Sequence, residues 1–128
     1  MNKRIILTAA FFGLIAVVLG AFGAHGLSGK IDDQNLDNWR TAVNYQFYHT
    51  LALLFLATFS RAKNTLINLS YVAFSVGILL FSGSLYLLAT RELTGVSAVH
   101  ILGPITPLGG LAFILGWASL FLATLKGR

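Results

Sequence analysis

Long stretches without a charged side chain alternate with short polar segments along this 128-residue chain. Four such stretches cover residues 5–27, 41–60, 64–90 and 93–125. A helix needs about 20 apolar residues to cross the hydrocarbon core of a bilayer, and each stretch is about that long or longer. A backbone surrounded by lipid has to satisfy its own hydrogen bonds, which favours helices over open sheets. The pattern therefore predicts an all-α membrane protein, a bundle of four transmembrane helices.

The fourth stretch is too long for a single straight crossing. Its 33 residues would make a helix of about 50 Å at about 1.5 Å per residue, well beyond a hydrocarbon core of about 30 Å. Thr106 followed by Pro107 has the pattern of an N-cap and a first helical residue, so we expect the fourth helix over 106–125. Residues 93–105, with their glycines and Pro104, are then an interfacial or partly re-entrant connection.

The one substantial polar segment lies between the first and second stretches. An aspartate, Asp32 or Asp33, is suited to cap a helix that begins just after it. Leu36, Trp39 and Val43 then share one helical face, which predicts a short amphipathic segment that lies at the membrane interface after the first helix and runs into the second. Within a single integral membrane domain, residues 1–128, the predicted transmembrane helices cover about 5–26, 40–60, 66–90 and 106–125.

The first stretch also has features of a cleavable signal peptide. Lys3 and Arg4 precede an apolar run, and small residues follow around 21–24. The run is longer than the usual core of about 7–15 residues in such peptides, and three more apolar stretches follow it. We therefore interpret it as a retained helix.

Composition strengthens the membrane interpretation. Hydrophobic residues make up 56% of the chain and charged residues 10%, against about 45–50% and about 25% in soluble domains. The chain has no cysteine, which excludes disulfides, cysteine-ligated metals and thiol redox chemistry. The net charge is +5, but the basic residues lie at the ends of apolar runs, so we expect no nucleic-acid partner.

The distribution of charge predicts the orientation. With four crossings both termini lie on one side, and that side carries six Lys and Arg and no acid, against three Lys and Arg on the other side. Because cytoplasmic loops carry the excess of Lys and Arg, both termini are expected in the cytoplasm. The basic residues of the terminal side are Lys3, Arg4, Arg61, Lys63, Lys126 and Arg128; the other side carries Lys30, Arg40 and Arg91 with the acids Asp32, Asp33, Asp37 and Glu92.

Polar side chains gather toward the outer halves of the predicted helices. Counting about 1.5 Å per residue places His49 near the middle of the membrane, with Gln46 on a similar face. An ionisable group inside a membrane is a functional hypothesis by default. The predicted ligand-binding residues are His25, Gln46, His49, Ser82, Ser84, Tyr86 and His100.

Each of these residues also has a purely structural interpretation. His49 is either neutral and hydrogen-bonded to a serine of the third helix, or a group that handles a ligand or a proton. Gln46 and the serines are suited to hydrogen bonds between helices. His25 and His100, at the interface, are suited to contact water or lipid head groups.

Three histidines raise the question of a metal or a haem. Their spacing is a weak signal, because no two lie within a helical turn and His25 and His49 differ in expected depth by about 12 Å. The predicted helices hold no carboxylate, and the chain has no Gly-x-Ser-x-Gly, HExxH or P-loop motif. A Ser82 or Ser84 nucleophile beside His49 would lack an acidic orienting group. We therefore assign no catalytic residue, metal ligand or cofactor, and favour a non-enzymatic protein.

Small residues recur at helical spacing, as in Gly20 and Ala24 and in Ala73 and Gly77. Such patterns let helix backbones approach closely. Packing within the bundle is the simpler interpretation, and a homo-oligomer interface is the alternative. The glycines at 109–110 offer either close packing or a mobile entrance.

Four motifs together resemble a known family. They are Gly20-Ala-Phe-Gly-Ala-His25, Tyr45-Gln46-x-x-His49-Thr50-Leu51-Ala52, Ser82-Gly83-Ser84-Leu85-Tyr86 and Thr106-Pro107-x-Gly109-Gly110. In this order they resemble the YgdD-type family of small bacterial inner-membrane proteins (domain of unknown function 423), which has eukaryotic relatives of the transmembrane protein 256 type. The resemblance covers nearly the whole chain and implies a multi-pass protein of the bacterial cytoplasmic (inner) membrane. It implies no established activity, cofactor or catalytic residue.

Three functions stay open at this point. The first is a non-enzymatic binding or accessory protein whose polar site takes a lipid, a quinone-like molecule or a partner helix; its partners would be membrane lipid and a second copy or another membrane protein. The second is a small transporter or channel component with His49 as a proton or ion relay. The third is a membrane redox protein that binds haem or a metal through its histidines.

Overall fold

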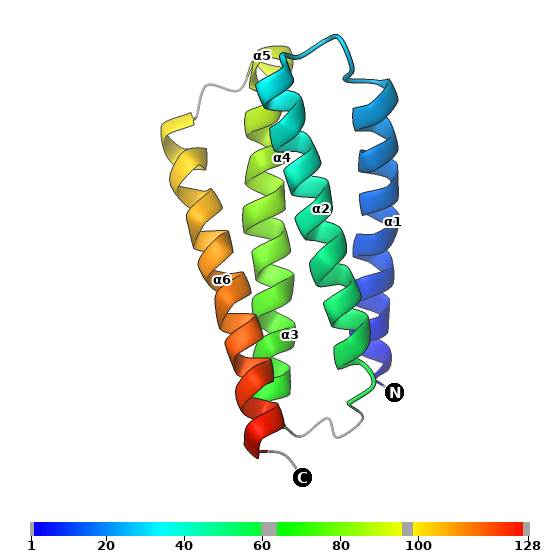
Figure 1. Cartoon of the computed structure of the whole chain (residues 1–128), viewed down its shortest axis with the longest axis vertical. Helices are drawn as coiled ribbons and strands as arrows, with labels where there is room; N and C mark the ends of the chain where they lie inside the picture. The colour runs from blue at the N-terminus through cyan, green and yellow to red at the C-terminus, as the bar shows by residue number, and fades with distance from the viewer. Residues whose placement is uncertain (1, 60–63, 96–98, 127–128) are drawn as a thin grey trace.

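The computed structural model describes residues 2–59, 64–95 and 99–126. Every regular element in these residues is helical, so the all-α prediction is confirmed for the part of the chain that the structure describes. The helices form four long rods that lie side by side (Figure 1).

The first two rods begin at side-chain caps. Helix α1 covers Lys3–His25, and the Asn2 side chain accepts a hydrogen bond from the Ile5 N–H. Helix α2 covers Asp33–Leu56. Of the two aspartates that the sequence offered as caps, Asp32 serves, accepting from the Asn35 N–H at 2.7 Å.

The predicted amphipathic segment runs into the second helix, as the sequence pattern suggests, but the helix begins earlier than predicted. It forms the first turns of α2, which begins at Asp33 rather than near 40. The Asp32 cap allows this early start. Leu36, Trp39 and Val43 share one face of α2 as expected, and this face belongs to a buried cluster at this end of the bundle.

Helix α2 also ends earlier than the predicted 40–60. Its last helical residue is Leu56. The Thr58 hydroxyl donates to the Phe55 carbonyl at 2.7 Å, and the Asn2 N–H donates to the Ala57 carbonyl at 3.0 Å. These bonds satisfy the carbonyls of the final turn, so the chain leaves the helix there.

The third rod consists of three consecutive helical segments where the sequence predicts one helix over 66–90. They are α3 (Thr65–Gly77), a wider π-helical turn η1 (Ile78–Ser82) and α4 (Gly83–Ala89). The Asn64 side chain caps the rod by accepting from the Leu66 and Ile67 N–H groups. A single-turn π-helix inside an α-helix is frequent at functional sites. The short helix α5 (Arg91–Thr94) follows and ends at Gly95, whose φ of 76° suits glycine.

The last rod, α6, covers Val99–Lys126, with both prolines inside it. The predicted start at 106 is therefore wrong, and residues 99–105 of the expected irregular connection are helical; residues 96–98 lie outside the described residues. Each proline removes one backbone N–H from the helix. Membrane helices tolerate such losses because neighbouring groups satisfy the freed carbonyls.

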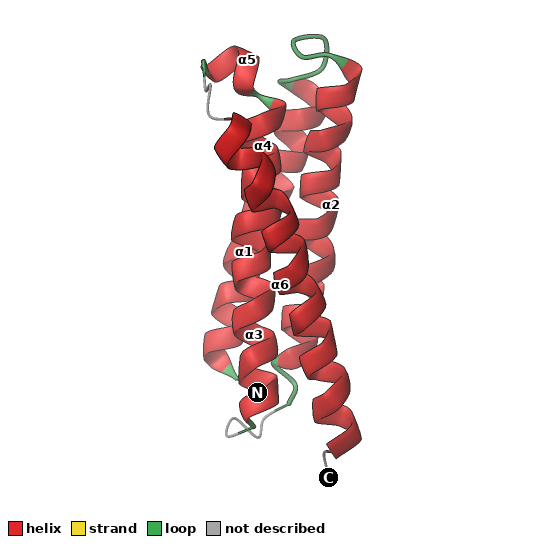
Figure 2. Cartoon of the chain, turned by 90° about the vertical axis from the view of Figure 1, so that its left-hand side faces the viewer, coloured by secondary structure: helices red, strands yellow, loops and turns green. Residues whose placement is uncertain are grey.

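The contacts between the rods are uneven, and most of them involve α2 or the third rod. Helix α1 packs against α2, while α6 packs along α3, η1 and α4 (Figures 1 and 2). Helix α6 meets α2 through side chains rather than backbone. Both ends of the chain lie at one end of the bundle, opposite the 26–32 loop and α5 (Figure 1).

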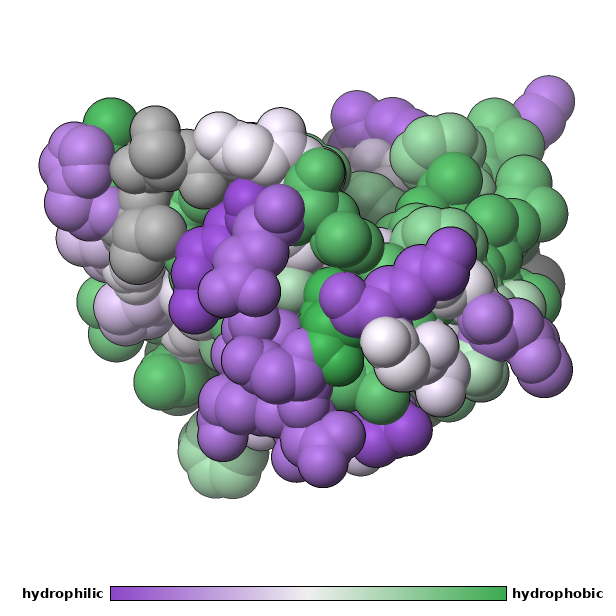
Figure 3. All heavy atoms as spheres, turned by 90° about the horizontal axis from the view of Figure 1, so that it is seen from above, coloured by the Kyte–Doolittle hydropathy of each residue, from purple (hydrophilic) through white to green (hydrophobic). Residues whose placement is uncertain are grey.

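Among the described residues, three rods are long and apolar enough to cross a membrane: Lys3–His25, Thr65–Ala89 and His100–Lys126. Helix α2 is not among them; it carries Asp33, Asp37 and Arg40 in its first turns and the polar residues Asn44, Gln46 and His49 further along. The fourth crossing of the sequence prediction is therefore not confirmed by length and composition. Seen from the end that carries α5, hydrophilic residues gather across the end of the bundle and hydrophobic residues lie beside them (Figure 3). Arg61, Lys63 and Arg128, which entered the orientation prediction, lie outside the described residues.

Glycines bring α6 into close contact with the third rod. The Phe113 ring lies where a Cβ at Gly77 would be, and the Phe74 ring lies where a Cβ at Gly116 would be. At Gly109 a Cβ would come within 2.7 Å of the Phe81 Cα, so here two backbones meet. Each ring thus fills a space opened by a glycine on the other helix, as small-residue packing in membranes predicts.

This packing predicts that Gly109→Ala destabilises the fold by about 1–3 kcal/mol, the usual cost of overpacking. The matched control is Gly83→Ala, because a Cβ at Gly83 meets nothing within 4 Å. That variant should be neutral or gain up to about 1 kcal/mol from helix propensity. The measurement is unfolding in mixed micelles with increasing denaturing detergent. Equal stability of the two variants would contradict the packing described.

Candidate functional site

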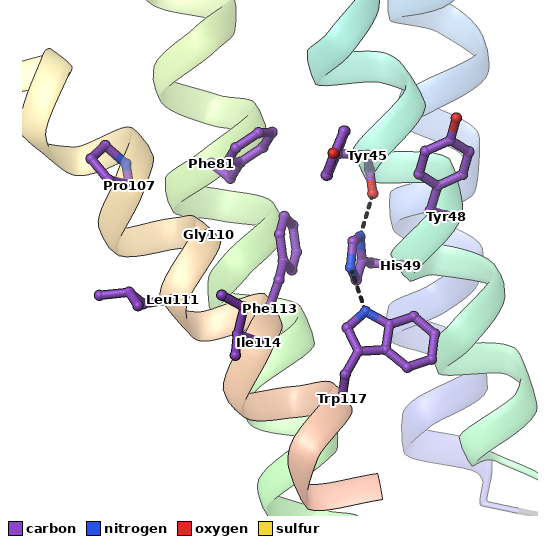
Figure 4. A pocket seen from close by; sticks show the side chains of 10 residues that line it. All are labelled: Tyr45, Tyr48, His49, Phe81, Pro107, Gly110, Leu111, Phe113, Ile114 and Trp117. Carbon is purple, nitrogen blue, oxygen red and sulfur yellow. Dashed lines mark hydrogen bonds between the residues drawn. The ribbon is translucent and has the colours of Figure 1, made fainter. Parts of the chain in front are cut away.

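The His49 side chain connects α2 with α6 in the middle of the bundle (Figure 4). It is 4% exposed. Its ring stacks on Phe113, with centroids 3.6 Å apart and planes inclined by 8°. The Trp117 Nε1 group donates to His49 Nε2 at 3.0 Å, and His49 Nδ1 lies 2.7 Å from the Tyr45 carbonyl oxygen. Both ring nitrogens are therefore engaged.

These partners define the tautomer of His49. An indole N–H can only donate and a carbonyl can only accept. His49 Nε2 must therefore accept from Trp117, and Nδ1 must carry the proton that is donated to Tyr45. A second proton on Nε2 would face the Trp117 N–H, donor against donor. His49 is thus placed as a neutral bridge to α6, not bonded to a serine of the third rod as the structural interpretation of the sequence had it.

A groove of about 830 Å³ lies beside His49, between α2 and α6 (Figure 4). Phe81 of the π-helical turn contributes to it from the third rod. The groove is lined by Tyr45, Tyr48, His49, Phe81, Pro107, Gly110, Leu111, Phe113, Ile114 and Trp117. Its volume falls within the range of about 300–1,000 Å³ that is common for small-molecule sites.

Several rings of the groove lie nearly parallel. The plane of Tyr45 is inclined by 22° to that of His49 and by 30° to that of Phe113. Phe81 lies against Tyr45, with centroids 4.7 Å apart. The groove therefore offers flat aromatic faces more than flexible aliphatic surface.

The groove lies at the middle of its helices. Phe113 is 13 residues from either end of the candidate span His100–Lys126, which is roughly 20 Å at about 1.5 Å per residue. The stacked His49 ring shares this depth. In a membrane the site would be far from water on both sides.

Two tyrosines that line the groove have hydroxyl groups without a partner in the described part of the chain. Tyr45 is 39% exposed and Tyr48 is 56% exposed. Neither hydroxyl makes a hydrogen bond within residues 2–59, 64–95 and 99–126. No lining residue is charged. Leaving a hydroxyl group unpaired in hydrocarbon costs on the order of 2–7 kcal/mol by transfer measurements. These two hydroxyl groups therefore favour an occupant that can accept a hydrogen bond.

Gln46, Tyr86 and Ser82 make hydrogen bonds between helices, away from the groove. The Tyr86 hydroxyl donates to Gln46 Oε1 at 2.6 Å, and Gln46 Nε2 donates to the Phe12 carbonyl at 2.8 Å. The Ser82 hydroxyl donates to the Ala42 carbonyl at 2.7 Å. These bonds connect α1, α2 and the third rod, so the three side chains act between helices and do not line the groove.

The remaining predicted residues lie elsewhere. The Ser84 hydroxyl lies 2.5 Å from that of Thr106 and connects α4 with α6. His25 is exposed at the end of α1 and His100 at the start of α6, on opposite sides of the bundle (Figure 1). The described residues contain no group of three or more His, Cys, Asp or Glu able to hold a metal ion. The structure thus brings Gln46 and Tyr86 into contact with each other, whereas Ser84 bonds to Thr106 and His49 to Trp117.

Sequence reasoning missed most of the groove. Phe113 and Trp117 are four residues apart on α6, as Tyr45 and His49 are on α2, so each pair shares a helical face. A tryptophan in the middle of an apolar run was the available signal, because its N–H needs an acceptor when buried. The sequence does not say that the acceptor is His49.

Comparisons with known proteins agree on one family. A family model described as "Protein of unknown function (DUF423)" matches residues 19–110. The chain is 44% identical over 124 residues to the UPF0382 membrane protein SAB0533 of Staphylococcus aureus, covering 97% of each chain. It is 46% identical over 127 residues to the UPF0382 membrane protein YwdK of Bacillus subtilis, covering 97% of this chain and 98% of that one. No solved structure matches.

The hydrogen bonds of His49 predict an unusual tautomer that can be measured. In protein labelled with ¹⁵N-histidine, His49 at neutral pH should give the resonances of a neutral ring protonated at Nδ1, with Nε2 as acceptor. His49→Gln assigns the signals. Trp117→Phe should shift the Nε2 resonance and leave those of His25 and His100 unchanged. A ring protonated at Nε2 would contradict the contact with Trp117.

Proposed function

The chain belongs to the DUF423 family of membrane proteins, and we propose that it is a non-enzymatic binding protein that holds a lipid-soluble molecule between α2 and α6. The ligand would enter the groove sideways from the bilayer. The binding residues are Tyr45 and Tyr48 on α2 and the rings around them, with His49 and Trp117 holding the two walls together. Of the residues expected from the sequence, His49 alone keeps a place in this site.

One observation carries the proposal. Tyr45 and Tyr48 line a groove at the middle of the helices, and neither hydroxyl has a hydrogen-bond partner in the described chain. A bilayer core has no water to satisfy them. Polar groups at this depth are costly and accordingly mark sites of function. An occupant that accepts a hydrogen bond removes this cost.

The proposal includes four crossings in a single integral membrane domain of the bacterial cytoplasmic membrane. Helix α1 and the rod Thr65–Ala89 run in the same direction (Figure 1). If both cross the bilayer, the chain has to return between them, and α2 is the element that does so. The excess of Lys and Arg at the end with both termini supports a cytoplasmic location for that end.

The other two functions receive less support from the contacts. A relay needs a ring nitrogen that takes up a proton and passes it on, whereas His49 uses both nitrogens in fixed hydrogen bonds. A haem or metal bound by the histidines would require these side chains to lie close together. His25 lies at the end of α1, whereas His100 lies at the start of α6. In the proposed arrangement, membrane lipid surrounds the protein. A helix of a second copy or of another membrane protein is the alternative occupant of the groove.

The orientation can be tested with single cysteines, since the natural chain has none. In protoplasts or spheroplasts, a membrane-impermeant maleimide should label Ser28→Cys, in the loop after α1. It should label Lys126→Cys, at the end of α6, only after the membrane is permeabilised. Labelling of both variants without permeabilisation would rule out the four-crossing arrangement. Labelling of Lys126→Cys alone would mean that the protein has the opposite orientation.

Occupancy of the groove can be tested by narrowing it. A Cβ at Gly110 has room, with Phe81 at 3.9 Å, so Gly110→Leu should project into the groove without displacing α6. Native mass spectrometry from a mild detergent should show a defined extra mass on the natural protein and its loss in this variant. Gly83→Leu is the control, because Gly83 borders a different cavity, between α1 and α4. Equal adducts on both variants, or none on the natural protein, would count against a groove ligand.

A further inference from the structure

We infer that the molecule in the groove between α2 and α6 is an uncharged planar ring that carries carbonyl oxygens and an apolar tail, the chemistry of a membrane quinone. This inference rests on the proposed function and specifies the ligand class of the same site. Three properties of the groove lead to it: the charge of its lining, the orientation of its rings and the unpaired hydroxyl groups of two tyrosines that line it.

The lining excludes a charged head group. None of the ten lining residues carries a formal charge, and His49 is held neutral by Tyr45 and Trp117. The groove also lies at the centre of the candidate span His100–Lys126. A phosphate, carboxylate or ammonium group at that depth would be buried without a counter-charge, at a cost far above that of a neutral polar group. The head group of the ligand is therefore neutral.

The rings favour a flat ligand. Tyr45, His49 and Phe113 have planes within 30° of one another, and the His49 and Phe113 rings are in direct stacking contact. Aromatic rings attract one another in offset stacked geometry, so a planar conjugated ring extends the existing stack. An acyl chain would contact the same surface without any preference for this alignment.

The hydroxyl groups favour a ring with acceptors. Tyr45 and Tyr48 each carry one O–H that can donate, three residues apart along α2 and thus on neighbouring positions of one face. A carbonyl oxygen accepts from such a group. A saturated chain offers nothing to either hydroxyl, and bulk water is absent at this depth.

The outer wall leaves a route for a tail. Leu111 and Ile114 line the groove on the α6 side and are 60% and 64% exposed. Their exposed surface faces away from the other rods, where a membrane places hydrocarbon. A ring held against Tyr45 and Phe113 can therefore keep its tail in the bilayer beside α6.

The test uses the fluorescence of Trp117, one of two tryptophans in the chain. Quinones quench indole fluorescence on contact, and Trp117 lies in the groove. Purified full-length protein in mild detergent is titrated with decylubiquinone. Saturable quenching is expected in the natural protein. It should be lost in Trp117→Phe, in which Trp39 is the remaining fluorescent tryptophan. Trp39 lies outside the groove and donates to the Leu19 carbonyl.

The ring and the hydroxyl groups are tested separately. The double variant Tyr45→Phe, Tyr48→Phe keeps both rings and removes both donors, so its half-saturation concentration should rise roughly tenfold. Decanol, which has a tail but no carbonyl ring, should not displace the quinone at equal concentration. A matched control is Tyr71→Phe, since Tyr71 lies between α1 and α3 and bonds to Thr8; it should bind as the natural protein does.

Failure of the inference is distinguishable from failure of the proposed function. If decanol competes equally and the double tyrosine variant binds unchanged, the quinone class is wrong, while a mass lost in Gly110→Leu still supports a groove ligand such as a lipid chain. If quenching is non-saturable and the natural protein carries no extra mass, both are wrong. If the natural protein has the mass of a dimer that Gly110→Leu dissociates, a second copy covers the groove, and both are again wrong.

Discussion

The close approach of α6 to the third rod at three glycines determines the remainder of this structure. Phe113 occupies the space beside Gly77, Phe74 occupies the space beside Gly116, and Gly109 brings the two backbones together at Phe81. The Ser70 hydroxyl adds a hydrogen bond to the Gly116 carbonyl at 2.8 Å. Helices in lipid gain little from burying apolar surface, so tight contacts and internal hydrogen bonds have to hold them together.

The same contact explains why a groove exists. Because α6 follows the third rod, it meets α2 through side chains, with His49 stacked on Phe113 and bonded to Trp117. Beside this contact of His49 with Phe113 and Trp117, the two helices enclose the aromatic groove, to which η1 contributes Phe81. The bridge is therefore both a structural contact and one wall of the proposed site. This combines the two interpretations of His49 that the sequence left open.

The sequence predicts the parts of the fold that depend on local chemistry. Apolar stretches without charge mark the rods, Asp32 caps α2, and Ala73 and Gly77 lie on α3, where Gly77 receives the Phe113 ring. The sequence does not predict the features that depend on which helices pack against each other. Periodicity shows which residues share a face, but not which helix that face meets, so Gln46 and His49 were expected in one site and serve two interfaces. The prolines of α6 were interpreted as a boundary because their tolerance in a membrane depends on surrounding groups.

A structure of the protein in a lipid nanodisc, with a bound antibody fragment to add mass, would show whether the groove between α2 and α6 holds a ligand. We expect α2 and α6 to be separated at the level of Phe81 and Phe113, with non-protein density within hydrogen-bonding distance of the Tyr45 or Tyr48 hydroxyl. Density of a planar head group with its tail beside Leu111 would agree with the proposed ligand class. A groove closed by its own side chains, or filled by a helix of a second copy, would contradict the proposed binding function.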